Sequence, residues 1–198
     1  MNRREFCFSA AAAATVAACS SQADDGRWWR GHAAATLVRP YKLLFDNRFA
    51  AARLLGAEAA RRGLAATAFD GDVTPLWLHD LGPRWAADRA PVAGITTPQA
   101  LFCLEQLARD AWMRVTVRAE HASGDAQRCR HRVSGQAASV PRICAALDAA
   151  ADWPARMAAA LVALPHDGSP PRQRRQVGAG GWRGDGHAAE LVSWMISA

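Results

Sequence analysis

The segment VAGITTPQALFCLEQLARDAWMRVTVRAE, residues 92–120, predicts a strand, a helix and a second strand in succession. The apolar run Val92–Ile95 has the length of a short buried strand. Pro98 follows two threonines, which is a typical helix start, so we expect a helix from Pro98 to about Ala111. Trp112–Glu120 alternates apolar and polar residues, as a half-buried strand does. The segment therefore favours a sheet covered by helices.

The sequence upstream of this segment continues the same alternation. Tyr41–Phe45 and Leu64–Phe69 are apolar runs that predict strands, and Phe49–Arg62 between them has the apolar spacing of a helix that Gly63 ends. Leu76–Trp85 predicts a short helix that is broken at its Gly-Pro pair.

Downstream, Arg128–Val133 predicts a strand that pairs back as a hairpin. Helices are expected from Pro141 to about residue 151 and over Trp153–Leu164. Residues 165–187 are rich in Pro, Gly and Arg and predict a long mobile loop, and Leu191–Ile196 predicts a last strand.

Strands that alternate with helices predict an α/β fold, with a parallel or mixed sheet, helices on its faces and antiparallel additions at an edge. We expect residues 36–198 to form a single domain of this class. Residues 24–35, which contain Trp28 and Trp29, are expected to be a linker, and residues 1–23 an export signal.

The charge does not indicate a nucleic-acid partner. The net charge is +6, but Lys42 is the only lysine and the arginines are scattered among acidic residues. A nucleic-acid-binding protein would gather its basic residues on one face, with aromatic residues between them. No apolar run of about 18 residues exists outside the Ala-rich N-terminus, which excludes a polytopic membrane protein.

The N-terminus has the organisation of an export signal. Arg3 and Arg4 are followed by a short Ala-rich apolar stretch that ends near Ala18. The Arg-Arg-x-Phe pattern resembles a twin-arginine signal, which implies passage through the twin-arginine export machinery in an already folded state. The region that follows resembles exported bacterial proteins, and no motif in it identifies a named functional family.

Val16-Ala17-Ala18-Cys19 resembles a bacterial lipobox. This resemblance implies that Cys19 becomes the lipidated first residue of the mature chain, so that the protein is tethered to the membrane in the periplasm. The alternative is simple cleavage after Ala23, because Ser21-Gln22-Ala23 has the small residues that signal peptidases prefer.

Polar side chains follow three of the expected parallel strands, and ligands bind beyond the carboxyl ends of such strands. Three acids and three hydroxyls would converge there, beside the N-terminus of the helix at Pro98. This composition favours a cation or a hydroxylated ligand. The alternative is that these residues only form turns and caps. The candidate ligand-binding residues, hereafter the rim, are Asp46, Arg48, Asp70, Asp72, Thr74, Thr96 and Thr97.

The Asp-x-Asp-x-Thr pattern at residues 70–74 resembles the nucleophile motif of haloacid-dehalogenase-like phosphatases. The resemblance implies that Asp70 is a nucleophile, that Asp72 is a general acid and base, that both hold Mg²⁺, and that Thr96 binds phosphate. The chain departs from this family in three ways, the first of which is that a strand and a helix precede the motif, whereas the family's nucleophile strand normally comes first. Its only lysine lies upstream of the motif, and a late acidic pair after a strand is missing.

Histidines and cysteines offer further alternatives. His121 and His131 flank the expected hairpin and could face each other, with Cys129 on the same side of the strand as His131, a set that could bind a metal. We favour surface histidines and assign no metal. Cys129 and Cys144 are expected to form a disulfide after export, whereas Cys103 is expected to be buried on the apolar stripe of its helix.

The leading hypothesis is a non-catalytic, envelope-tethered protein that binds a small ligand or a partner subunit in the periplasm. The first alternative is a Mg²⁺-dependent phosphoesterase that uses Asp70 and Asp72. The second alternative is an accessory subunit of an exported redox complex. We assign no catalytic residue and no cofactor from the sequence, and we expect no nucleic-acid partner.

Overall fold

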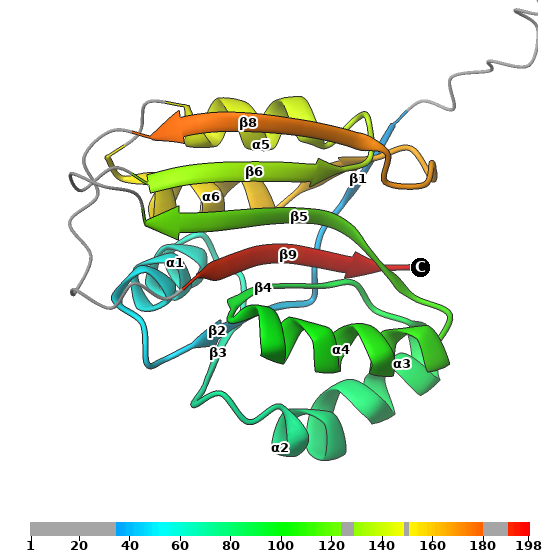
Figure 1. The fold of residues 1–198 in the computed structure, drawn as a ribbon. Helices are drawn as coiled ribbons and strands as arrows, with labels where there is room; N and C mark the ends of the chain where they lie inside the picture. Colours follow the sequence, from blue (N-terminus) through cyan, green and yellow to red (C-terminus); the bar gives the residue numbers. More distant parts are fainter. Residues whose placement is uncertain (1–34, 124–128, 149–150, 180–189) are drawn as a thin grey trace, which may run out of the picture. The chain divides into compact units, whose positions relative to one another are not determined.

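A seven-stranded mixed sheet with helices on both faces organises the chain, and a separate two-stranded sheet lies beside it (Figure 1). The structure, a computed structural model, describes residues 35–123, 129–148, 151–179 and 190–198. The predicted α/β class is confirmed. The predicted export signal, Cys19 and all of the linker except Ala35 lie outside the described residues.

The strands and helices follow one another as the sequence indicates, with three additions. These additions are β1, β7 and β8. In chain order the elements are β1 (Thr36–Val38), β2 (Lys42–Asp46), α1 (Ala50–Arg61), β3 (Ala66–Phe69), α2 (Thr74–Leu76), the π-helix η2 (Trp77–Leu81), α3 (Gly82–Asp88), β4 (Val92–Thr96), α4 (Pro98–Asp110), β5 (Arg114–Ser123), β6 (Cys129–Gly135), α5 (Val140–Leu147), α6 (Trp153–Leu161), β7 (Leu164–His166), β8 (Gln173–Ala179) and β9 (Leu191–Ser197).

The main sheet has the order β3-β2-β4-β9-β5-β6-β8. β2 pairs in parallel with β3 and with β4, and every other pair is antiparallel. The antiparallel additions that we predicted at an edge form a whole side of the sheet, from β9 to the edge strand β8. The last strand, β9, lies in the middle of the sheet between β4 and β5, and all seven of its residues are buried.

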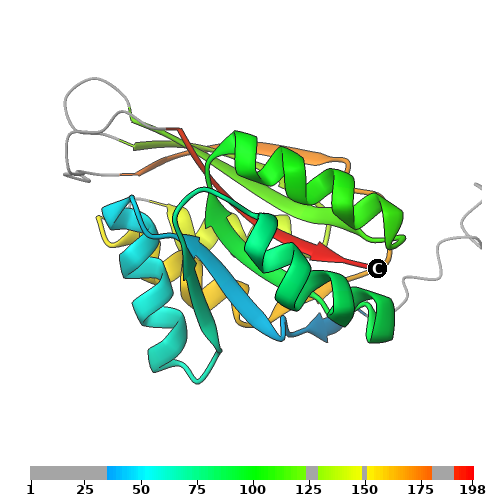
Figure 2. The ribbon, with the colours of Figure 1, turned by 90° about the horizontal axis from the view of Figure 1, so that it is seen from below.

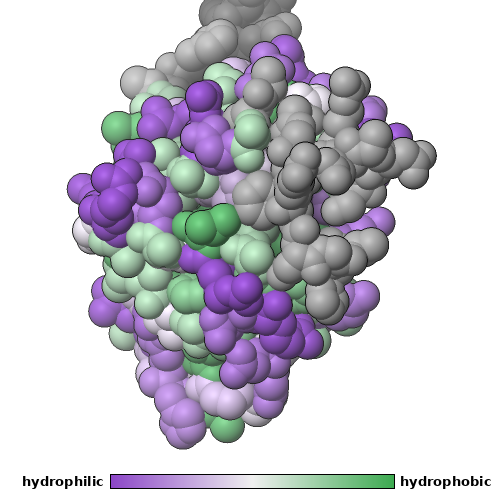
Figure 3. Space-filling model, turned by 90° about the vertical axis from the view of Figure 1, so that its left-hand side faces the viewer, coloured by the Kyte–Doolittle hydropathy of each residue, from purple (hydrophilic) through white to green (hydrophobic). Residues whose placement is uncertain are grey.

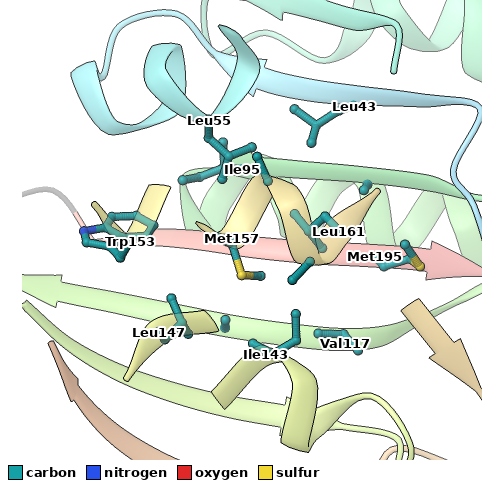
Figure 4. Close-up of a cluster of buried hydrophobic side chains, with 14 of the residues drawn as sticks. Leu43, Leu55, Ile95, Val117, Ile143, Leu147, Trp153, Met157, Leu161 and Met195 are labelled. Carbon is teal, nitrogen blue, oxygen red and sulfur yellow. The ribbon is translucent and has the colours of Figure 1, made fainter. Parts of the chain in front are cut away.

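Each face of the sheet carries its own apolar core. Helices α1, α5 and α6 cover one face, while α2, α3 and α4 lie on the other (Figure 2). Residues from β2, β4, β5 and β9 meet the first group of helices in the core drawn in Figure 4. On the opposite face, Trp85 of α3 and Leu101 of α4 pack against Trp194 of β9.

Local sequence signals explain the ends of two helices. Gly63 adopts a φ of 77° directly after α1, a conformation that favours glycine and ends the helix as expected. The hydroxyl of Thr97 accepts a hydrogen bond from the Ala100 amide at 3.3 Å and caps α4. Cys103 is exposed on α4, so its predicted burial is wrong, because Leu101 and Leu104 supply the apolar stripe.

Residues 76–85 do not form one short helix that ends at Gly82-Pro83. Instead, the π-helix Trp77–Leu81 leads directly into α3, with Pro83 in the first turn of that helix. A proline interrupts the interior of an α-helix because it lacks an amide hydrogen and clashes with the preceding turn. The change of helix type before Pro83 removes both conflicts.

Residues 165–187 are not a loop throughout, since β7 and β8 lie within this range. β8 pairs with β6 and forms one edge of the main sheet, whereas β7 pairs with β1 in the two-stranded sheet. Four consecutive polar residues, Gln173–Gln176, hid β8 from a hydrophobicity pattern, because an edge strand buries little of its surface. Residues 180–187 lie outside the described part.

Candidate functional site

Asp46 and Arg48 of the rim bind each other at the carboxyl end of β2. The Asp46 carboxylate is fully buried and accepts hydrogen bonds from Arg48 Nε at 2.8 Å and Nη2 at 2.6 Å. These bonds, together with the charge of Asp46, raise the pKa of Arg48. The buried carboxylate therefore has a cationic partner already, and this leaves it poorly suited to binding a second cation.

Asp70, Asp72 and Thr74 follow β3 in an exposed turn. The Asp72 carboxylate accepts a hydrogen bond from the Thr74 amide at 2.8 Å, and this bond lowers the pKa of Asp72. The Arg48 guanidinium lies against this turn, because a Cβ added at Gly71 would come within 2.4 Å of Arg48 Nη2. Asp46, Arg48 and the turn thus do come together, as the sequence suggested.

Thr96 and Thr97 of the rim are engaged in the fold. Thr96 is buried, and its hydroxyl accepts a hydrogen bond from Trp194 Nε1 at 3.1 Å and donates one to the Thr97 carbonyl at 3.1 Å. Thr97 caps α4. Figure 3 views the end of the molecule where β2, β3 and β4 finish, and hydrophilic and hydrophobic residues are interspersed on it. The bonds within the rim are those of turns and caps.

A β-bulge in β5 sets the face of the sheet to which the polar side chains of this strand point. Val115 pairs with Ile196 and Val117 pairs with Met195, so Thr116 is an extra residue. A bulge reverses the alternation of a strand. As a result Val115 faces α4, whereas Val117 faces α5 and α6. The residues beyond the bulge follow this new phase, which sends Arg118 and Glu120 to the face that carries α4.

A cavity of about 470 Å³ lies on that face, over β5, β6 and β8 and beside the start of α4. We call it the arginine groove. Three arginines line it, together with two glutamates, a glutamine and the histidines His121 and His131. The charged and amide side chains that line the groove are Arg118, Glu120, Arg130, Arg132, Gln176 and Glu190, and Pro98 lines it at the N-terminus of α4.

The three arginines differ in how far their charge is neutralised. Arg118 forms an ion pair with Glu105 of α4, and Arg132 forms one with Glu120 at 3.2 Å. Among the described residues Arg130 has no ion-pair partner. Its neighbours across the strands are Ala122 and Gly178, and a Cβ added at Gly178 would meet no atom within 4 Å. Arg130 therefore stands beside open space.

Sequence reasoning missed the arginine groove, although a signal was present. Residues 118–120 and 130–132 place charged side chains two positions apart, which puts them on one face of a strand. We noted this spacing only for Cys129 and His131. The contribution of Gln176 could not be found at all, because residues 173–179 were expected to be loop.

The opposite face of the same hairpin buries a histidine pair. His121 and His131 are cross-strand neighbours, and their Nδ1 atoms lie 2.7 Å apart. His121 Nε2 lies 2.8 Å from the hydroxyl of Ser193 on β9, and the His121 ring stacks on Trp153 of α6 at 4.1 Å. The two histidines therefore do face each other, but they are buried and not at the surface as we had favoured.

Burial keeps this histidine cluster (His121, His131, Cys129, Ser193 and Trp153) neutral. It lowers the pKa of His131 to about 4 and that of His121 well below its usual range, with the neighbouring His131 adding to the second effect. Burial also raises the pKa of the Cys129 thiol to about 11. No group of three metal-binding side chains occurs in the described residues. Ser193 is fully buried, so it cannot reach a substrate as a nucleophile.

Cys129 and Cys144 carry free thiols in the structure, so the predicted disulfide is not formed there. Cys129 is buried on β6 and Cys144 is half-buried on α5. Burial raises the pKa of both thiols, which disfavours the thiolate that starts disulfide exchange.

Two features of the structure bear on the phosphatase resemblance. Asp70 follows β3, which is an edge strand of the main sheet. Lys42 begins β2 and forms an ion pair with Asp80, so it lies at the opposite end of the parallel strands from Asp70. The lysine is therefore remote from the carboxylate that the resemblance would make the nucleophile.

Comparisons of the chain with protein families, with curated proteins and with solved structures found no match. Within the described ranges, no helix has the length and apolar character needed to cross a membrane. The arginine groove and the residues around it are therefore the features that bear on the function.

Proposed function

We propose that this protein is an exported, envelope-tethered binding protein that takes up a small anionic ligand in the arginine groove and performs no catalysis on it. The observation that carries the proposal is Arg130, a cation beside open space in a concave site. The proposal keeps the leading hypothesis of a non-catalytic binding protein. It places the ligand in the arginine groove and not at the rim, and it assigns an anionic ligand where the rim favoured a cation or a hydroxylated one.

The charges around the groove support an anion. Arg118 and Arg132 each have one carboxylate partner, whereas Arg130 has none among the described residues. A guanidinium that is not neutralised by the protein can donate two parallel hydrogen bonds to a carboxylate or a phosphate. Arg130 is therefore the residue that would bind the negative group of the ligand directly.

The N-terminus of α4 also favours a negatively charged ligand. Pro98 lines the groove at the first turn of this thirteen-residue helix. The amides in the first turn of a helix have no partners within the helix, and they give that end a partial positive charge. Thr97 satisfies one of these amides, that of Ala100. The end of the helix adds to the positive potential that the arginines create.

The size and the other polar groups of the groove support a small ligand. A volume of about 470 Å³ lies within the range of small-molecule sites. Gln176 and Glu190 offer an amide and a carboxylate, which can bind hydroxyl groups of the same ligand. A polyhydroxylated acid combines an anionic group with such hydroxyls, and it matches the groove better than a large protein surface does.

Titration calorimetry with citrate, a small hydroxylated carboxylate, tests the proposal. We expect saturable binding that weakens as the salt concentration rises, because charged groups in an open groove are screened by ions. Arg130→Gln should weaken binding about tenfold, since a charge-assisted hydrogen bond contributes about 1.5–3 kcal/mol. The matched control is Arg156→Gln, which removes an exposed arginine that pairs with Asp152 on α6.

A second variant tests the groove by shape and leaves every charge in place. Gly178→Phe places a ring in the open space beside Arg130, where an added Cβ meets nothing. We expect this change to block citrate while the melting temperature stays within about 2 °C of the original, because an exposed edge strand tolerates the larger side chain. Equal citrate binding by the native protein, Arg130→Gln and Gly178→Phe would refute the site.

Export and tethering rest on Arg3-Arg4 and on the lipobox that ends at Cys19. Cells fed a palmitate analogue should incorporate it into the protein, and Cys19→Ala should abolish this label. Label that persists in Cys19→Ala would argue against the lipid anchor and for cleavage after Ala23. This outcome is independent of the citrate measurement.

A further inference from the structure

A second cavity, of about 480 Å³, lies at the opposite end of α4 from the arginine groove. We call it the tryptophan groove. Three tryptophans line it, one from the π-helix, one from α3 and one directly after α4. The residues that matter here are Trp77, Trp85, Trp112, Gly82, Arg89 and Asp110.

Both the side chain and the backbone of Trp112 are in unfavourable environments. Its side chain is 81% exposed, although tryptophan is among the side chains that gain most from burial. Its backbone has a φ of 58°, in the left-handed region that favours glycine. A glycine would satisfy the end of α4 at lower cost. A strained, exposed tryptophan at the edge of a cavity is typical of a residue kept for binding.

One other irregular backbone segment borders the same groove. Trp77 begins the π-helix, a conformation that occurs often at functional sites. Gly82 lets the chain approach Trp77 closely, since an added Cβ would lie 3.3 Å from its indole ring. Trp77 and Trp85 meet edge to face at 6.0 Å. The π-helix thus places Trp77 between the tryptophan groove and the apolar core to which Trp85 belongs.

The helix dipole and Asp110 at this end of α4 favour a cation, while Arg89 and Arg109 offset part of their negative charge. Asp110 is the last residue of the helix and lines the groove. The carbonyls of a last helical turn give that end a partial negative charge. The two ends of α4 therefore differ in sign, and the tryptophan groove lies at the negative end.

We propose that the tryptophan groove binds a small soluble trimethylammonium compound. The faces of tryptophan rings attract quaternary ammonium groups, whose charge is spread over methyl groups and needs no hydrogen-bond acceptor. Trp112 and the half-buried Trp77 supply the aromatic surface that such a group requires, since Trp85 is buried, and Asp110 supplies the negative charge. Arg89, the other charged residue of the groove, suits a carboxylate on the same compound, as in a betaine.

Paired ligands of equal shape test the proposal on the purified full-length protein in a maltoside detergent. Choline and 3,3-dimethylbutan-1-ol have the same outline, but only choline carries the positive charge. By titration calorimetry we expect choline to bind at least about tenfold more tightly than the alcohol, because the cation–π attraction is lost with the charge. Glycine betaine should bind more tightly than choline, and Arg89→Gln should remove that difference.

Variants at one exposed position separate the aromatic face from bulk. Trp112→Phe keeps an aromatic ring and should hold choline binding within about threefold. Trp112→Leu keeps an apolar side chain in the same backbone conformation and should weaken choline about tenfold. Both variants should fold, since the Trp112 side chain has few neighbours, and equal circular dichroism spectra and melting curves provide the check.

Three results would overturn the proposal. The first is equal affinity for choline and the uncharged alcohol, which would make the groove merely apolar. The second is unchanged choline affinity in Trp112→Leu. The third is sedimentation with phosphatidylcholine vesicles but not phosphatidylglycerol vesicles while free choline fails to bind, which would point to a membrane surface. None of these results depends on whether citrate binds the arginine groove.

Discussion

The two halves of the main sheet use their polar residues in different ways. In the parallel half, formed by β3, β2 and β4, the polar residues gather at the strand ends and bind one another. In the antiparallel half, formed by β9, β5, β6 and β8, the strand alternation separates them. Charged residues face the arginine groove, and the histidine cluster lies beneath α6.

This difference shows that polar residues gathered at the ends of parallel strands do not by themselves form a ligand site. Asp46 is satisfied by Arg48, and Thr96 by Trp194, so little binding capacity remains. Arg130 lies in a regular strand with small neighbours, and its capacity to bind is unused by the fold. The four predictions below test the contrast.

The largest expected effect is in the interior of the antiparallel half. Trp153→Ala should reduce the free energy of unfolding by about 4 kcal/mol, because it leaves a large cavity beside the stacked histidines. Trp112→Ala is the matched control and should change the free energy by less than about 0.5 kcal/mol, because that side chain is exposed. Chemical denaturation measures both. Similar losses of unfolding free energy in the two variants would contradict this prediction.

The histidine pair should make stability fall with acid. In the unfolded chain the pKa of a histidine is about 6.5, whereas burial lowers the pKa of His131 in the folded protein to about 4. Between pH 6.5 and pH 4 the unfolded chain therefore binds a proton that the folded chain excludes, and stability drops as the pH decreases through this window. The loss should reach about 3 kcal/mol for His131 alone, measured by denaturation at several pH values.

A substitution identifies the source of this pH dependence. His131→Leu removes one of the two buried imidazoles, so the fall in stability between pH 6.5 and pH 4 should become shallower, whatever its effect at neutral pH. His79→Leu, at an exposed position, should leave the slope as it is. A slope that stays the same in His131→Leu would show that the buried pair is not responsible.

In the parallel half, the rim ion pair should respond asymmetrically. Arg48→Ala leaves the buried Asp46 carboxylate without its partner and should cost about 2 kcal/mol of unfolding free energy. Asp46→Ala should cost less, because the Arg48 side chain is 49% exposed and water can solvate it. Thermal or chemical denaturation of the two variants gives the order. The reverse order would mean that Asp46 has a second cation nearby.

The smallest effect is expected at Asp70. Asp70→Asn should change the free energy of unfolding by less than about 0.5 kcal/mol, since the residue is exposed. We also expect no Mg²⁺-dependent hydrolysis of a phosphate ester by the native protein, because catalysis of phosphoryl transfer needs cations around the transferred group and Lys42 lies at the other end of β2. Turnover that disappears in Asp70→Asn would restore the phosphoesterase alternative.

Much of the fold could be predicted because its signals are local. The apolar runs of β2 and β4, the spacing of α1 and the threonine cap of α4 each lie within a few neighbouring residues. β8 escaped prediction because this edge strand begins with four consecutive polar residues and has no apolar run. The place of β9 escaped because strand order depends on contacts between distant segments, which no local pattern contains.

The sites were harder to predict for the same reason. Asp46, Arg48 and the turn at Gly71 lie together, but their hydrogen bonds depend on side-chain geometry, which the sequence does not contain. The arginine groove needed the bulge at Thr116, which sets the phase of Arg118 and Glu120. The tryptophan groove needed Trp77 and Trp112 to meet across 35 residues of sequence.

The central position of β9 has a consequence for how the chain is made. Until residues 191–197 leave the ribosome, β4 and β5 have no strand between them, and each half of the sheet exposes an open edge. The nascent chain must therefore be kept from aggregating until its last strand arrives. A nonsense mutation between Ala179 and Leu191 would leave two half-sheets without β9, a product that cellular proteases should degrade quickly.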